Sequence, residues 1–196
     1  RGVLDVTLGR TWSRYRALQN ESLSPPTPIF RANTTEGEQL LRADVQLEPR
    51  DGLEVSAGAM VKFASRLAYD VKLPGFARLD DAGTPHALTI DTSFTAARSG
   101  AYAQASWKPM PRVRLTAGAR GDLYAFLDNA FRFSPRLGAR VGVGDHTTLT
   151  MAAGRYWQSP QYIWLIGDAS NRDALRPFRA DHLVAGIERE VRPDLK

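Results

Sequence analysis

Alternation of apolar and polar residues is the feature that most limits what this chain can fold into. Its clearest case runs from Leu41 to Glu48, where every odd position is apolar and every even position is polar. Successive side chains of a β-strand point to opposite faces, so this period of two places all the apolar residues on one face. A second case, Ser134–Pro160, contains two such segments around the turn residues Gly144–His146 and predicts a β-hairpin.

The same alternation recurs along the chain and predicts about eight strands of roughly nine to twelve residues, the length that a tilted strand needs to cross a hydrocarbon core. The connections between them are short and long in turn. Short turns are predicted at Pro49–Gly52, Pro109–Pro111 and Gly144–His146, and mostly loop at Ser13–Gly37, Ser65–Ala97 and Gln158–Arg179. In an up-and-down antiparallel meander alternate connections share one end of the sheet, and transmembrane β-barrels have this asymmetry between short turns and long loops.

Aromatic residues occur near the predicted strand ends, as the two interfacial girdles of a membrane barrel require. Trp107 lies beside a short turn, and the others lie where a strand meets a long connection. The predicted interfacial aromatics are Trp12, Phe63, Trp107, Tyr124, Tyr156 and Trp157. A soluble β-sandwich binding module, which would place its large aromatics at mid-strand in the core, is the alternative that this pattern disfavours.

Composition excludes several other classes. No run of about 18 apolar residues is present, so no transmembrane helix is predicted. The chain has no cysteine, which rules out a disulfide framework and cysteine metal sites. The net charge is +5, but the arginines are dispersed, which argues against a nucleic-acid surface. His86, His146 and His182 lack metal-ligand spacing and no catalytic motif occurs, so we expect no metal, no cofactor and no catalysis.

The second half contains a pair of adjoining segments, Ala101–Pro109 and Arg112–Asp122, with the pattern of two consecutive barrel strands. This pair resembles barrel strands of TonB-dependent outer-membrane receptors, and two further motifs resemble the same family. Ser134–Leu137 followed by Gly154–Pro160 resembles its "SPRLG … GxYxQxP" signature, and Leu175–Arg189 resembles the strand that comes next. The motifs follow the family's order over residues 100–191, whereas the first half matches only as a generic barrel. Phe178-Arg179 stands where the family often has an acidic residue.

The resemblance implies a barrel of about twenty-two strands, an N-terminal plug domain, a TonB-type energy transducer, and uptake of a bulky solute such as a siderophore across the outer membrane of a Gram-negative bacterium. No plug-like segment is visible, so we expect residues 1–196 to form a single-domain portion of the barrel wall. A turn signal at Arg192–Asp194 adds to the interpretation as a fragment. The alternative is a self-contained eight-stranded outer-membrane barrel, although its many inward glycines would fill a narrow lumen poorly.

The polar positions of these strands are expected to line the lumen, where charged rows face a solute or a plug domain, and the apolar positions to contact lipid. The predicted lumen-lining residues are Arg42, Asp44, Gln46, Glu48, Arg114, Arg120, Asp122, Arg136, Arg140, His182 and Glu188. Loops carry recognition on a rigid scaffold, so ligand contacts are expected from the last long connection, at Trp157, Gln158, Tyr162 and Trp164. The face that Tyr102 occupies is left open by its strand.

Overall fold

Eight strands form one antiparallel sheet in sequential order, which confirms the predicted all-β meander. The computed structural model describes residues 1–79, 82–128, 130–166 and 170–191, apart from the side chains of residues 75–78; the turn signal at 192–194 lies outside these ranges. The elements are β1 (Gly2–Leu23), β2 (Pro26–Arg50), β3 (Leu53–Leu79), β4 (Pro85–Met110), β5 (Val113–Tyr124), β6 (Phe131–Val143), β7 (Thr147–Gln158), α1 (Tyr162–Leu165), α2 (Asn171–Ala174) and β8 (Phe178–Arg189). Neither described helix is long and apolar enough to cross a bilayer.

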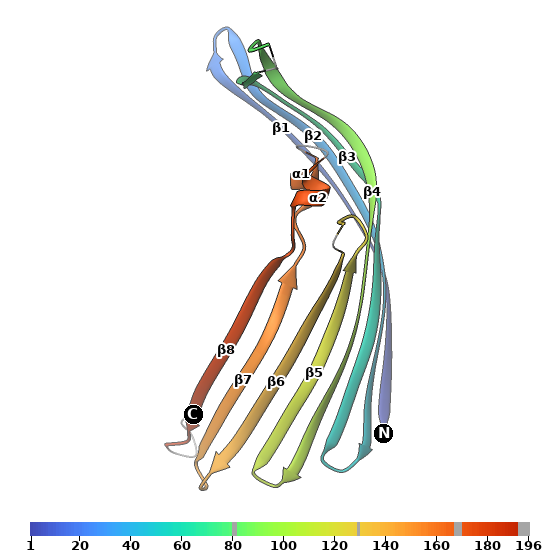
Figure 1. The fold of residues 1–196 in the computed structure, drawn as a ribbon, viewed down its shortest axis with the longest axis vertical. Coiled ribbons are helices and arrows are strands. Elements are labelled where there is room, and N and C mark those ends of the chain that lie inside the picture. The colour runs from blue at the N-terminus through green and yellow to red at the C-terminus, as the bar shows by residue number, and fades with distance from the viewer. Residues whose placement is uncertain (80–81, 129, 167–169, 192–196) are drawn as a thin grey trace.

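The sheet is a curved, open wall (Figure 1). Among the described residues, β1 pairs only with β2 and β8 pairs only with β7. A β-sandwich needs a second sheet, and a closed eight-stranded barrel needs pairing between β1 and β8. Both structural alternatives are therefore wrong for these strands. Each edge strand instead has one side along which its backbone N–H and C=O groups pair with no described strand.

The strands have two heights. β1 to β4 contain 22 to 27 residues, whereas β5 to β8 contain 12 or 13. In Figure 1 the four longer strands continue far past the ends of the others, so the predicted loops at Ser13–Gly37 and Ser65–Ala97 are wrong. These segments have polar residues on both faces, which removes the alternation that identifies a strand. The predicted short turns are confirmed, with positive φ at Gly52 (75°) and Gly144 (71°).

Register places the apolar positions of all eight strands on one face. Leu8 faces Leu41, which faces Val61, and farther along Ala139 lies between Leu115 and Met151. The segment between β7 and β8 crosses the opposite face, because Tyr162 hydrogen-bonds Glu38 of β2, so the apolar face is the convex one (Figure 1). Its large side chains are exposed, up to 83% for Leu8 and 86% for Leu183. Exposed apolar patches of this extent mark a contact with lipid or protein.

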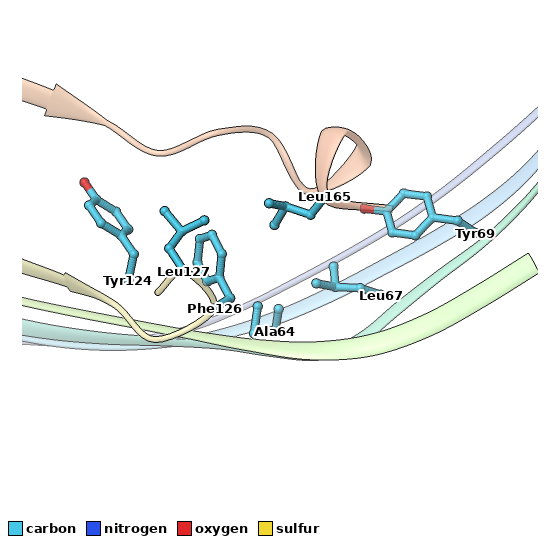
Figure 2. Close-up of a cluster of buried hydrophobic side chains, with 8 residues drawn as sticks. Ala64, Leu67, Tyr69, Tyr124, Phe126, Leu127 and Leu165 are labelled. Atoms are coloured by element: carbon cyan, nitrogen blue, oxygen red, sulfur yellow. The ribbon is translucent and has the colours of Figure 1, made fainter. Parts of the chain in front are cut away.

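A hydrophobic cluster holds the segment between β7 and β8 against the concave face (Figure 2). Leu165 of α1 is 3% exposed and points toward side chains of β3 and of the connection between β5 and β6. A bulge between Ala64 and Leu67 shifts the register of β3, so that Leu67 and Tyr69 also point into the hollow. The cluster consists of Ala64, Leu67, Tyr69, Ala96, Tyr124, Phe126, Leu127 and Leu165.

Aspartate at Ala139 should impair insertion of the receptor that contains this chain, because the convex position would bury a carboxylate in hydrocarbon at a cost of about 2 kcal/mol. The measurement is the folded, heat-modifiable fraction of the protein in isolated membranes. Gly138→Asp is the matched control, because Gly138 lies on the concave face of the same strand and has no neighbour closer than 3.7 Å to an added Cβ. Equal insertion of the two variants would show that the convex face does not meet lipid.

Replacing Leu165 with Ala should release the segment between β7 and β8, since a buried leucine truncated to alanine loses about 2–4 kcal/mol. The readout is trypsin cleavage after Arg172, whose guanidinium lies 5.2 Å from the Phe94 ring in the docked segment. Cleavage should accelerate by about ten-fold or more. Ile163→Ala, a change in the same helix at a residue 44% exposed, should leave the rate near that of the parent. Unchanged cleavage in Leu165→Ala would mean that the cluster does not hold the segment.

Candidate functional site

The concave face of β2, β4 and β5 carries a network of paired charges. Arg42 forms two hydrogen bonds with Asp44, at 2.5 and 3.0 Å, and the Tyr102 hydroxyl donates to Asp44 Oδ1 at 2.8 Å. Tyr102 therefore faces the hollow, which decides the question that the sequence left open. On β5, Arg120 pairs with Asp122, with Nη2 2.6 Å from Oδ1. Arg42 and Tyr102 thus hold Asp44 from two sides, and the guanidinium of Arg120 holds Asp122, so charge-assisted bonds fix both carboxylates on the wall.

Two glycines give this network its space. A Cβ at Gly58 would contact Asp44 Oδ1 and would lie 2.6 Å from Tyr102 Cε1. A Cβ at Gly100 would lie 2.5 Å from Asp122 Oδ1 and 2.7 Å from Arg120 Nη2. These three distances are far inside van der Waals contact, so glycine at both positions allows the side chains of neighbouring strands to lie over the backbone.

Register places all the predicted lumen-lining residues with this network on the concave face, although their role toward a solute or a plug domain stays a prediction. Arg140 pairs with Glu188 across β7 at 3.1 Å, and Arg114 lies 3.7 Å from Glu54. The His182 ring lies 5.0 Å from that of Tyr156. These outer pairs are exposed, so each contributes little to stability.

A cavity of about 660 Å³ lies between the upper part of this network and the segment that follows β7. From the sheet it is lined by Glu36, Glu38, Met60, Lys62, Arg98, Arg120, Asp122 and Tyr124, and from above by residues 157–163. The wall therefore offers cations, carboxylates and a phenol, while the roof offers aromatic and amide groups.

Two tyrosines connect the cavity to the carboxylates of β2. Tyr162 donates to Glu38 at 3.1 Å, and Lys62 forms an ion pair with the same carboxylate. Tyr69 donates to Glu36 at 2.5 Å. Burial, and then the neighbouring carboxylate, raise the pKa of both tyrosines above the usual phenol range, so the hydroxyls stay protonated and act as donors. Sequence reasoning missed Glu36 and Tyr69 because it placed them in loops, and Glu38 because it lies just before the predicted strand that begins at Leu41.

One cationic group in the cavity wall has spare hydrogen-bonding capacity. Arg98 Nε is buried and has no hydrogen-bond acceptor among the described residues. An unpaired buried donor costs free energy, roughly 1–3 kcal/mol, that an incoming acceptor would recover. The guanidinium is therefore a candidate contact for an oxygen-rich ligand.

Three of the four predicted ligand-contacting residues line this cavity, namely Trp157, Gln158 and Tyr162. Trp164 does not; its ring packs against Phe178 at 5.8 Å. The Trp157 indole N–H donates to the Phe133 carbonyl at 2.9 Å, just beyond the point where β6 and β7 stop pairing at Arg136 and Gly154. Pro135 has no N–H for a further ladder bond, which leaves a gap that the indole occupies.

The predicted interfacial aromatics divide between the two faces. Trp12, Phe63 and Trp107 lie exposed on the convex face. Tyr124 is 5% exposed in the concave cluster, and Tyr156 packs beside His182 on the concave face. A girdle residue must face lipid, so the interfacial prediction is wrong for both. Each is in phase with the polar positions of its strand, a signal that the sequence contained.

Comparison with known proteins gives the chain its family. The TonB dependent receptor-like β-barrel family matches residues 2–195. The chain belongs to this receptor family. The resemblance predicted from three motifs is thereby confirmed, and it extends over the first half of the chain, where the sequence looked only generic. No curated protein matches the sequence significantly.

Solved structures share the fold of this TonB-dependent receptor segment. They include the FpvAI–pyocin S2 complex (TM-score 0.65, 17% identity, 98% of this chain and 29% of that one) and the copper transporter OprC (0.65, 15%, 95% and 33%). A third is Pseudomonas aeruginosa FpvA bound to heterologous iron–pyoverdine complexes (0.62, 16%, 95% and 28%). The chain thus spans a third or less of their length. At these identities the likeness shows the fold, and the family and these neighbours are receptors and transporters.

Alanine at Gly58 should destabilise the wall, because its Cβ would displace Asp44 from Tyr102 and would lie 3.0 Å from the Ala43 carbonyl. We expect a loss of about 1–3 kcal/mol, as for other overpacked sites, measured as a lower urea midpoint of the intact receptor in detergent. Gly186→Ala is the matched control, because nothing lies within 4 Å of a Cβ on that concave strand position. If both variants unfolded at the same urea midpoint, the close packing at Gly58 would not contribute to the free energy of unfolding.

Proposed function

We propose that residues 1–196 form part of the barrel wall of an outer-membrane receptor that imports a bulky solute with energy supplied by a TonB-type inner-membrane protein. The single observation that carries this is the cavity at the tall end of the wall, between a charged concave face and a docked roof segment. The proposal includes an outer-membrane location, which the exposed apolar convex face supports.

The wall has the features of a scaffold that meets another domain. The pair Arg42–Asp44 lies outside the cavity lining, whereas the pair Arg120–Asp122 is part of the cavity wall. Both pairs direct carboxylates and guanidinium groups into the hollow. We propose that these rows contact a plug domain in the intact receptor, since a wide barrel of this family is closed by one. Fixed, pre-paired charges suit a contact that must be released during transport, because little side-chain ordering is needed each time it forms again.

The cavity chemistry supports a solute rich in oxygen acceptors. Lys62, Arg98 and Arg120 supply cations, and Gln158 supplies an amide. The buried phenol of Tyr124 and the partly buried phenol of Tyr162 lie beside them. A metal chelate with carboxylate, hydroxamate or catecholate oxygens would use these donors. The structural neighbours bind iron–pyoverdine complexes in one case and transport copper in another, and we propose the siderophore class for this receptor.

Uptake of iron-loaded siderophores, with ferric pyoverdine as the first probe and cobalamin and copper as comparisons, should be measured in cells that carry the intact receptor as their sole transporter of this type. Arg98→Gln should raise the half-saturating concentration by about ten-fold, because a charged donor to the solute is lost. Trp164→Phe, which lies outside the cavity, should match the parent.

Two results would contradict the proposal. Uptake that continues at full rate after deletion of the TonB-type protein would exclude energised import. Equal uptake by Arg98→Gln, Trp164→Phe and the parent would move the solute contact away from this cavity, provided that the amounts of each receptor in the outer membrane are equal.

A further inference from the structure

Arg10 occupies an unusual position for a charged residue. It follows Leu8 and precedes Trp12 on the convex face of β1, and both of these neighbours are exposed, 83% and 62% respectively. Across the sheet Arg10 faces Gln39, which faces Phe63, another exposed aromatic of the convex face. Its guanidinium therefore lies at the edge of the apolar band, where an unpaired charge is costly.

A second arginine is brought to the same edge by the bulge in β3. Two residues, Ser65 and Arg66, stand between the concave side chains of Ala64 and Leu67, and both are exposed. Arg66 lies beside Gly37, which in turn faces Trp12, and a Cβ at Gly37 would lie 3.6 Å from the Trp12 ring and 3.9 Å from Arg66 Cβ. Arg10 and Arg66 are thus two strand spacings apart across the sheet and two residues apart along it, roughly 12 Å between their backbones, within reach of one polar headgroup.

No described residue supplies a counter-charge for this pair. Neither Arg10 nor Arg66 has a hydrogen bond or ion pair with a side chain in the part of the chain that the structure describes. Arg14, one step above Trp12, donates to the amide oxygen of Asn33 at 3.4 Å, and no carboxylate among the described residues pairs with it. The nearby acids Glu36 and Glu38 are directed to the opposite, concave face, where they bond Tyr69 and Tyr162.

We propose that Arg10 and Arg66, with Arg14 above them, form a site on the outside of the wall for the phosphorylated headgroup of an outer-leaflet glycolipid. The proposal rests on the membrane location proposed above. The apolar residues below the arginines contact the acyl chains, Trp12 lies at the boundary, and the guanidinium groups bind lipid phosphate. Arginine suits this role because its planar fork binds phosphate through paired hydrogen bonds. The site lies on the opposite side of the wall from the solute cavity.

The test is a titration of the intact, detergent-solubilised receptor with diphosphoryl lipid A, compared with the same lipid after removal of its phosphates. The double variant Arg10→Gln/Arg66→Gln should bind diphosphoryl lipid A about 30-fold more weakly, and raised salt should weaken the parent in the same direction. The matched control is Arg31→Gln/Lys72→Gln, which removes two exposed cations from β2 and β3 farther from the apolar band. It should bind as the parent does.

Heat-modifiable mobility shows whether each variant is folded. If the double variant does not insert, the single variant Arg66→Gln, above the apolar band, is titrated in its place. Its affinity for diphosphoryl lipid A should fall by about five-fold. Equal losses in the two double variants, equal binding of the dephosphorylated lipid, or full competition by inorganic phosphate would each overturn the site. Solute uptake by the same variants is measured in parallel, so that a failed lipid site is distinguished from a failed transport proposal.

Discussion

The continuous antiparallel ladder from β1 to β8 determines where every functional side chain lies. A membrane-spanning wall has no water with which to satisfy its backbone, so each strand must pair along its length, and pairing fixes the face of each residue. From that register follow the apolar convex face, the charged concave face and the spacing of Arg10 and Arg66. Where the ladder is interrupted, at the β3 bulge and before Pro135, the chain acquires features that regular strands would not provide.

The part of the fold that spans the predicted membrane could be derived from sequence because its two faces meet different solvents. In Leu41–Glu48 the residues alternate strictly between apolar and polar, as the two different environments require. The upper halves of β1 to β4 show no such alternation, since polar residues occupy both of their faces, and Pro and Asn favoured a loop prediction. The bulge at Ser65 was also invisible, because one extra residue changes the register without changing composition.

The candidate site shows the same division. The lumen-facing arginines and acids of β2 and β5 followed from alternation alone, and Gln158 and Tyr162 followed from their place in a connection. Glu36, Glu38 and Arg98 required the structure, because only the tall strands bring them under the roof segment. Tyr156 was assigned by its nearness to a strand end when its phase with Gly154 gave the correct face. Phase along a strand is therefore a better guide to the environment of an aromatic than distance from the strand end.

The docked roof segment has a mechanical consequence. Leu165 packs against β3 and Tyr162 bonds β2, on the far side of the hollow from β7. The connection after β7 therefore links the two sides of the concave face. Moving β7 away from β2 and β3 would break the contacts of Leu165 and Tyr162, whereas bending of the sheet below them would not. Side chains of the docked segment thus stabilise the curvature at the tall end of the wall, while lower down the backbone hydrogen bonds of the ladder do so. The width of the wall can therefore change at one end independently of the other.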